Sequence, residues 1–140
     1  AVKLGLVDVA RSVQIGIRTE CDDYLGIRYL SAAEVHENGV GWAVDEVKKI
    51  VGDAPTYLTF DIDALDPAFA PGTGTPEPGG LTSIQGIEII RGCWGLNLVG
   101  ADLVEVSPPY DTTGNTSLLA ANLLFEMLCA FPGCERREGQ

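Results

Sequence analysis

The sequence has few of the residues and motifs that usually carry catalytic chemistry. Its 140 residues include one histidine, His36, and four cysteines, with no CxxC pair. A zinc or disulfide framework is therefore not expected, and one histidine makes neither Ser-His-Asp nor Cys-His catalysis credible. No GxGxxG or Walker motif is present, and residues 72–80, GTGTPEPGG, place prolines where a phosphate-binding loop needs free N–H groups. These absences argue against zinc-finger, triad-hydrolase and nucleotide-binding classes.

Long apolar runs and positive charge are also scarce. No run approaches the roughly 18 apolar residues of a membrane span, and no signal peptide opens the chain. The net charge is -11 and the isoelectric point about 4.3. This balance argues against nucleic acid and anionic membranes as partners, and it is compatible with a cationic substrate or metal ions. We expect a cytoplasmic protein with reduced thiols.

An initiator methionine is missing as well. The only methionine is Met127, and the chain opens with AVKLGLVDVA. We therefore expect a processed chain or a piece of a longer one. Apolar residues make up 46% of the sequence, enough to build a core, and the length suits one domain or part of one.

The residues that are present alternate between strand and helix patterns. Strands are predicted at 12–18, 27–31, 56–63 and 96–107, a brief helical turn at 31–34, and helices at 40–51, 82–92 and 116–131. The last helix is expected to be well covered, and the tail at 132–140 to be frayed. This order predicts an α/β fold, a three-layer α/β/α arrangement with a mostly parallel sheet. Ligands of such folds bind outside the carboxyl ends of the strands.

Two aspartates stand at the end of the third predicted strand. Asp61 and Asp63 are two residues apart, so the alternation of a strand would place both on one face. Carboxylates this close repel each other and raise each other's pKa unless a cation lies between them. Oxygen ligands of this kind suit Mn²⁺ or Mg²⁺. The alternative is that they cap a turn of the following loop, a role that fits Asp66, which precedes Pro67.

A glutamate occupies a similar place in the last predicted strand. Glu105, in LVEVSPP, is predicted to be buried, and a buried carboxylate needs a cation. It either holds a cationic substrate or forms an ion pair with an arginine such as Arg18 or Arg91. His36 is predicted to lie in a solvent-facing turn and not to bind metal.

The segment FDIDALDPAFAPGTGTPEPGGLT, residues 60–82, resembles the signature of the ureohydrolases, which include arginases, agmatinases and guanidinobutyrases. QIGIRTE at 14–20 and VGADLVEVSPPYD at 99–111 resemble agmatinase most. The resemblance runs from about Ser12 to Phe131, most of the chain. It implies the arginase-like fold.

The resemblance also implies an activity and roles for particular residues. The family hydrolyses a guanidino group and releases urea, with two Mn²⁺ ions per complete active site. By resemblance, Asp61 and Asp63 bind metal, Asp63 is thereby catalytic, and Glu105 faces the guanidinium of a small cationic substrate. Thr75 and Asp66 are expected to support the loop. Agmatine, yielding putrescine and urea, is the expected substrate; guanidinobutyrate or another amidine is the alternative.

The sequence departs from the family pattern in one large respect. The family's histidine and aspartate motifs of the form GGDHS and DAHxD are absent, and so is an HGT- or HGN-like segment. We therefore expect residues 1–140 to be the C-terminal part of a single ureohydrolase domain. A second hypothesis is that the chain alone is an inactive fragment or an assembly subunit. The family implies a homo-oligomer, a trimer or hexamer, for the complete protein.

Overall fold

The computed structural model describes residues 1–134 and contains four strands, three helices and four short 3-10 turns. In chain order these are η1 (Val2–Leu4), η2 (Val9–Arg11), β1 (Val13–Ile17), β2 (Arg28–Ser31), α1 (Ala32–Val51), β3 (Thr56–Asp61), η3 (Ile62–Ala64), α2 (Ser83–Gly92), β4 (Leu98–Val104), η4 (Pro108–Tyr110) and α3 (Asn115–Ala130). The predicted alternation of strands and helices is confirmed.

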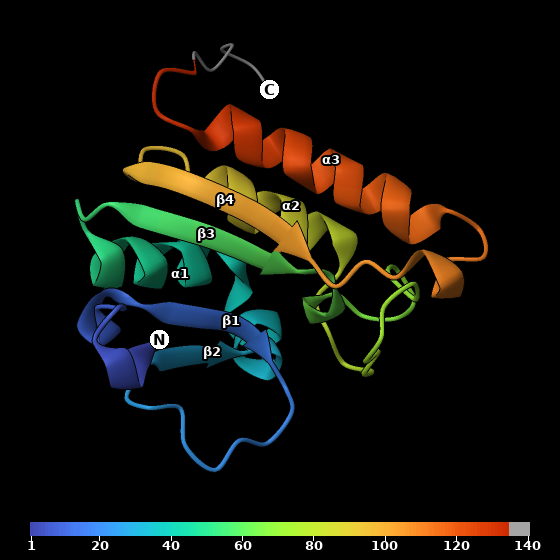
Figure 1. Ribbon diagram of the computed structural model, residues 1–140, viewed down its shortest axis with the longest axis horizontal. Helices are drawn as coiled ribbons and strands as arrows, with labels where there is room; N and C mark the ends of the chain where they lie inside the picture. Colours follow the sequence, from blue (N-terminus) through green and yellow to red (C-terminus); the bar gives the residue numbers. More distant parts are fainter. Residues whose placement is uncertain (135–140) are drawn as a thin grey trace.

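The strands form two parallel pairs, β1 with β2 and β3 with β4. All four arrows point the same way in Figure 1, so the carboxyl ends of the strands lie at one edge of the molecule. The predicted α/β class with parallel strands is confirmed. This common edge is where folds of this class bind ligands.

Helix α1 joins two predicted elements, the helical turn at 31–34 and the helix at 40–51. The Ser31 hydroxyl accepts a hydrogen bond from the Glu34 N–H, and the Glu34 carboxylate accepts one from the Ser31 N–H, which completes a capping box. Gly39 has φ 84° and ψ 164° and divides the helix into residues 32–38 and a longer second part. A positive φ of this size favours glycine, so the kink is fixed by the residue type.

The core lies between one face of the β3–β4 pair and the helices. Phe60 and Leu65 pack against Gly86 of α2, where an added Cβ would lie 3.0 Å from the Leu65 side chain. The opposite face of the pair carries Tyr57, which is 59% exposed, and the exposed Thr59. Alternation along β3 explains the division, since residues two apart share a face. In the described part of the chain, helices therefore cover the Phe60 face only.

Helix α3 differs from the prediction that it would be well covered. Leu118 is 71% exposed, Phe125 61% and Leu128 65%, while Leu123 and Met127 are buried. The buried residues recur at helical spacing and face α2, to which α3 is adjacent in Figure 1. Leu119 is half-buried against the same core, whereas the exposed Leu118, Phe125 and Leu128 point away from it.

The predicted frayed tail at 132–140 lies outside the described residues from 135 onward. Before that point the Cys134 N–H donates to the Phe131 carbonyl at 3.2 Å, so the chain makes a turn after α3. None of the helices within residues 1–134 combines the length and the apolar character needed to cross a membrane.

Candidate metal and substrate site

Asp61 and Asp63 come together through a turn and not through strand alternation. Strand β3 ends at Asp61, and Asp63 belongs to the 3-10 turn η3, so the prediction that both project from one strand face is wrong. The Asp61 Oδ1 accepts a hydrogen bond of 3.1 Å from the Asp63 N–H. This contact folds the backbone into a tight turn and keeps the two carboxylates close together at the carboxyl end of β3.

The environment of Asp61 disfavours its negative charge. Burial is the first cause and, together with the neighbouring charges of Asp63 and Glu105, raises the pKa of Asp61 from 3.8 to about 6. The hydrogen bond from the Asp63 N–H lowers the pKa of Asp61, but by less than the other causes raise it. Three carboxylates from the ends of two neighbouring strands thus gather where a cation would relieve their repulsion.

Glu105 differs from the prediction of a buried strand residue. Strand β4 ends at Val104, and Glu105 is exposed, with φ 67°. A non-glycine residue in this left-handed region interrupts the extended backbone, which explains why the strand is shorter than predicted. Such strained residues gather at functional sites. Because Val104 is the register partner of Asp61, Glu105 leaves β4 at the edge that carries Asp61.

Neither arginine considered as a partner of Glu105 pairs with it. Arg91 binds Glu126 at 2.6 Å, and Arg18 donates to main-chain carbonyls. Within residues 1–134 no ion pair involves Glu105. Its carboxylate therefore has no arginine or lysine partner from this part of the chain.

Asp66 has the turn-forming role that the sequence favours. Its carboxylate accepts from the Ala68 N–H at 2.9 Å and from the Gly79 N–H at 2.7 Å, closing the loop between η3 and α2 on itself. These backbone donors lower the pKa of Asp66 below its usual value. Thr75, from the middle of the loop, donates its hydroxyl to the Asp63 Oδ2 at 2.9 Å, as expected of a supporting residue.

His36 has a contact that sequence reasoning missed. Its Nε2 lies 3.0 Å from the Gly80 carbonyl oxygen, and its Nδ1 lies 3.4 Å from the Gln85 Nε2. His36 is exposed, as predicted, but it lies in α1 and not in the predicted turn, and it fixes the end of the loop beside Asp66. The partners are more than 40 residues away in the sequence, so no local pattern signals them.

The carboxylates fit a hard divalent cation by chemistry, although they do not make a complete site. Asp61 and Asp63 supply oxygen ligands and excess negative charge, which suit Mn²⁺ or Mg²⁺ better than soft metals. Among residues 1–134, no three histidine, cysteine, aspartate or glutamate side chains are grouped so as to hold a metal ion. These aspartates can therefore supply only part of a coordination sphere.

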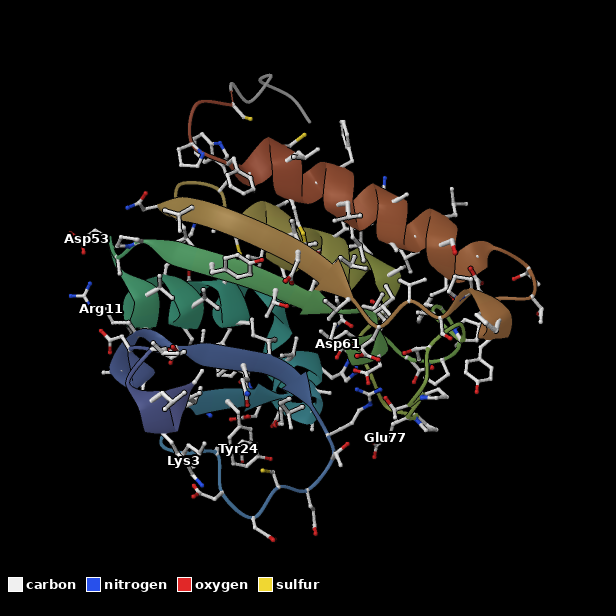
Figure 2. The ribbon with its side chains drawn as sticks, in the orientation of Figure 1. Lys3, Arg11, Tyr24, Asp53, Asp61 and Glu77 are labelled. Atoms are coloured by element: carbon white, nitrogen blue, oxygen red, sulfur yellow. The ribbon has the colours of Figure 1, made fainter. Side chains whose placement is uncertain are left out.

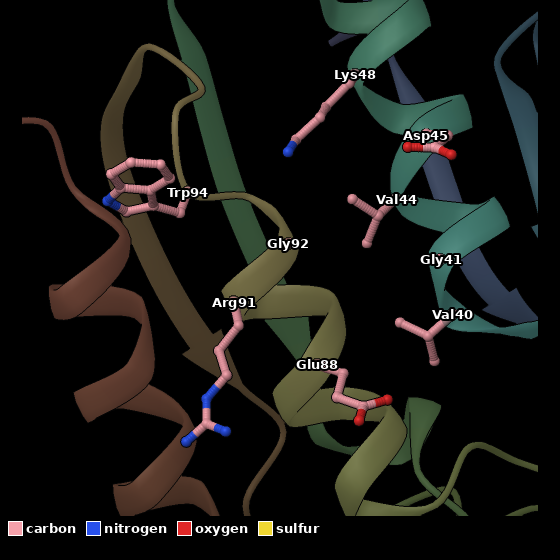
Figure 3. Close-up of a pocket in the computed structure, with 9 residues that line it drawn as sticks. All are labelled: Val40, Gly41, Val44, Asp45, Lys48, Glu88, Arg91, Gly92 and Trp94. Carbon is pink, nitrogen blue, oxygen red and sulfur yellow. The ribbon is translucent and has the colours of Figure 1, made fainter. Parts of the chain in front are cut away.

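A separate hollow of about 510 Å³ lies between α1 and α2 (Figure 3). The two helices meet at Val44 and Gly92, where an added Cβ on the glycine would lie 2.3 Å from the valine side chain. The hollow opens beside this contact and carries both signs of charge, including Lys48 and Glu88. It contains none of the carboxylates at the strand ends, so the candidate site is the open edge and not this hollow.

The fold and the carboxylate edge agree with what known proteins show. The sequence profile of the arginase family matches residues 1–129. The chain belongs to the arginase family, whose members here include the agmatinases and guanidinobutyrases described next.

The similar proteins carry the names of enzymes that act on guanidino compounds. The chain is 57% identical to the guanidinobutyrase of Pseudomonas aeruginosa, over 98% of this chain and 46% of that protein. It is 56% identical to the agmatinase of Chromobacterium violaceum, over 92% of this chain and 40% of that protein. A crystal structure of a hypothetical agmatinase from Burkholderia thailandensis superposes with a TM-score of 0.90 at 56% identity, over 92% of this chain and 41% of that one. The chain thus spans less than half the length of these relatives, and the arginase-like fold is confirmed.

Proposed function

We propose that the protein containing this sequence is a Mn²⁺-dependent amidinohydrolase that converts agmatine to putrescine and urea. The observation that carries the proposal is that Asp61, Asp63 and Glu105 lie at the carboxyl edge of β3 and β4, where burial and then the neighbouring carboxylates raise the pKa of Asp61. We further propose that residues 1–140 are the C-terminal part of a single ureohydrolase domain.

Each carboxylate has a distinct role in this proposal. Asp61 and Asp63 hold metal through their oxygen atoms, and the Thr75 hydroxyl orients the Asp63 carboxylate. Mn²⁺ ions held there would acidify water and so would provide a nucleophile near neutral pH. Glu105 accepts hydrogen bonds from the guanidinium and so orients the carbon that is attacked. Asp63 is catalytic in the sense that it holds the metal on which hydrolysis depends.

The charge of the edge favours a substrate that is positive at both ends. Agmatine carries a guanidinium and an ammonium group, whereas guanidinobutyrate carries a carboxylate that would meet Asp61, Asp63 and Glu105. The similarity to the guanidinobutyrase of Pseudomonas aeruginosa supports the alternative, in which the carboxylate is bound by a positive group elsewhere.

The test is a substrate panel with the full-length protein. Purified protein loaded with Mn²⁺ is given agmatine, guanidinobutyrate or arginine, and urea is measured. We expect the highest kcat/KM with agmatine. Faster turnover of guanidinobutyrate than of agmatine would make guanidinobutyrate the assigned substrate. The absence of urea from all three compounds would overturn the proposal.

A second candidate concerns the 140-residue chain by itself. Among residues 1–134 no three metal-binding side chains are grouped closely enough to hold a metal ion, which supports an inactive fragment or an assembly subunit. We expect the isolated chain to release little or no urea and to hold no tight pair of Mn²⁺ ions. Metal analysis of the purified chain tests this, because two tightly held Mn²⁺ ions per chain would contradict it.

The assembly and location of the complete protein stay predictions. We propose a homo-oligomer, a trimer or hexamer, in the cytoplasm. Light scattering of the full-length protein distinguishes these states from a monomer.

A further inference from the structure

Arg18 connects the end of β1 to the loop that carries the candidate metal ligands. It follows Ile17, the last residue of β1, and its side chain is partly buried. The Nη2 group donates to the Asp63 carbonyl oxygen at 2.7 Å and to the Glu77 carbonyl oxygen at 2.5 Å, and Nε donates to the same Glu77 oxygen at 3.0 Å. One guanidinium therefore joins both ends of the segment between Asp63 and Glu77.

The residues at both ends of that segment are held by further contacts. The Asp63 N–H donates to Asp61, and the Asp63 carboxylate accepts from the Thr75 hydroxyl. The Glu77 carboxylate accepts a hydrogen bond from the hydroxyl of Thr19, the residue next to Arg18. The backbone and side chain of Asp63 are thus fixed separately, and Arg18 supplies the only contact among these that reaches its carbonyl oxygen.

The guanidinium binds carbonyls and not a carboxylate. Among residues 1–134, no aspartate or glutamate forms an ion pair with Arg18. Its positive charge is therefore not neutralised by an ion pair at an edge where carboxylates repel one another. The planar fork of arginine can reach two acceptors at once, whereas the lysine ammonium is a single point of charge on a flexible stem.

We propose that Arg18 is a positioning residue for the metal site, because it fixes the Asp63 carbonyl and closes the loop from Asp63 to Glu77. The inference rests on the proposed function, in which Asp63 holds metal. A residue that holds a metal ligand in place changes metal affinity even when the protein remains folded.

The experiment uses the full-length protein and three variants. Arg18→Ala removes the contacts with the Asp63 and Glu77 carbonyls, and a longer one of 3.4 Å from Nη1 to the Gly16 carbonyl. Arg18→Lys keeps the charge but not the fork. Arg11→Ala is the matched control, since Arg11 is exposed and paired with Asp53. Figure 2 shows Arg11 and Asp53 at the opposite end of the strands from Asp61 and Glu77. Circular dichroism checks folding, the signal of free Mn²⁺ in electron paramagnetic resonance gives its affinity, and urea release gives kcat/KM.

We expect Arg18→Ala to weaken Mn²⁺ binding by about 10–100-fold, the range typical of residues that support metal ligands. The Mn²⁺ affinity of Arg18→Lys should lie between those of Arg18→Ala and the parent, and the affinity of Arg11→Ala should match that of the parent. A folded Arg18→Ala protein that binds Mn²⁺ within about twofold of the parent would overturn the inference. If Arg18→Ala does not fold, Arg18→Lys decides in the same way, because unchanged Mn²⁺ affinity there contradicts the need for the fork.

The parent protein separates this inference from the proposed function. If the parent binds Mn²⁺ and releases urea while both Arg18 variants bind Mn²⁺ equally well, only the role of Arg18 is lost. If the parent neither binds Mn²⁺ nor releases urea, the proposed function is wrong and the role of Arg18 is lost with it.

Discussion

The loops that follow β3 and β4 leave the same edge of one parallel pair, but they place their aspartates in opposite surroundings. Asp61, at the start of the first loop, is partly buried and meets the charges of Asp63 and Glu105, and these causes raise its pKa to about 6. Asp111, at the end of the second loop, accepts hydrogen bonds from the Ser117 hydroxyl and N–H and from the Thr116 N–H, and its pKa is lowered.

The difference separates a structural carboxylate from a candidate functional one. Asp111 satisfies N–H groups at the start of α3, where a negative charge is stabilised by the helix dipole. The loops also touch here, since an added Cβ on Gly72 would lie 2.5 Å from the Asp111 Cβ. Asp61 accepts a hydrogen bond from the Asp63 N–H but has repulsive neighbours, an arrangement that lowers stability until a cation binds.

The largest expected effect comes from removing a candidate metal ligand. In the full-length protein, Asp63→Ala should lower kcat/KM by more than about 100-fold, above the loss typical of residues that only support ligands. Bound Mn²⁺, measured by elemental analysis, should fall with it. Asp53→Ala is the control, because this fully exposed aspartate lies at the far end of the strands in Figure 2. Full activity and full metal content in Asp63→Ala would contradict the assignment.

Removing the structural carboxylate should instead reduce stability. Asp111→Ala leaves the Thr116 and Ser117 N–H groups without their acceptor. We expect the midpoint of thermal unfolding to fall by a few degrees, as for loss of a helix cap. Because the pKa of Asp111 is lowered, its contribution is present above the ordinary pKa and is lost as the pH falls through the folded-state value. The parent should therefore lose this advantage over the variant in acid, as measured by thermal unfolding across the acid range.

The ionisation of Asp61 should change stability with pH in the opposite direction to that of Asp111. Its folded-state pKa of about 6 exceeds the ordinary 3.8, so the metal-free folded protein takes up a proton as the pH falls from about 6 to about 4 and gains stability over that range. Asp61→Asn removes the repulsion at neutral pH. In the metal-free protein it should raise the free energy of unfolding at pH 7 by on the order of 1 kcal/mol, after allowance for solvent screening of a partly exposed group.

Denaturant unfolding with a chelator present measures the effect of Asp61→Asn. If Asp61→Asn destabilised the protein at pH 7, Asp61 would be a stabilising carboxylate like Asp111, and the contrast between the two would be lost. A variant whose stability shows the same pH dependence as the parent between pH 4 and pH 6 would contradict the raised pKa.

The sequence predicted the elements well because their signals are local. The helical turn at 31–34, the helix at 82–92 and the turn at Asp66 each depend on residues close in the chain, and the structure shows a capping box at both Ser31 and Thr82. The prediction that Asp61 and Asp63 are neighbours was right for the wrong reason, since spacing alone does not show where a strand stops. Contacts across the chain, such as His36 with Gly80, leave no local pattern.

Burial was the least predictable property. Glu105 was expected inside a strand, but its positive φ ends β4 first and leaves it exposed. The apolar side of α3 was expected to be covered, but Leu118 and Phe125 are exposed. Apolar composition shows which residues can be buried, whereas the arrangement of the other elements decides which of them are.

The smallest effect is expected where a carboxylate has a good counter-charge. Arg91 of α2 binds Glu126 of α3 through two hydrogen bonds, 2.9 Å from Nε and 2.6 Å from Nη2, which raise the pKa of Arg91 and lower that of Glu126. The arginine side chain is about half exposed, so Arg91→Ala should cost less than about 1 kcal/mol, and 1 M salt should reduce the difference from the parent.

A double-mutant cycle with Glu126→Gln gives the coupling between the two residues. A coupling well above 1 kcal/mol would mean that the ion pair, and not the packing of buried Leu123 and Met127, holds α3 on α2. A small coupling would show that a satisfied carboxylate between these helices contributes little. Repulsion among the carboxylates near Asp61 would then affect the free energy of unfolding more than the Arg91–Glu126 ion pair does.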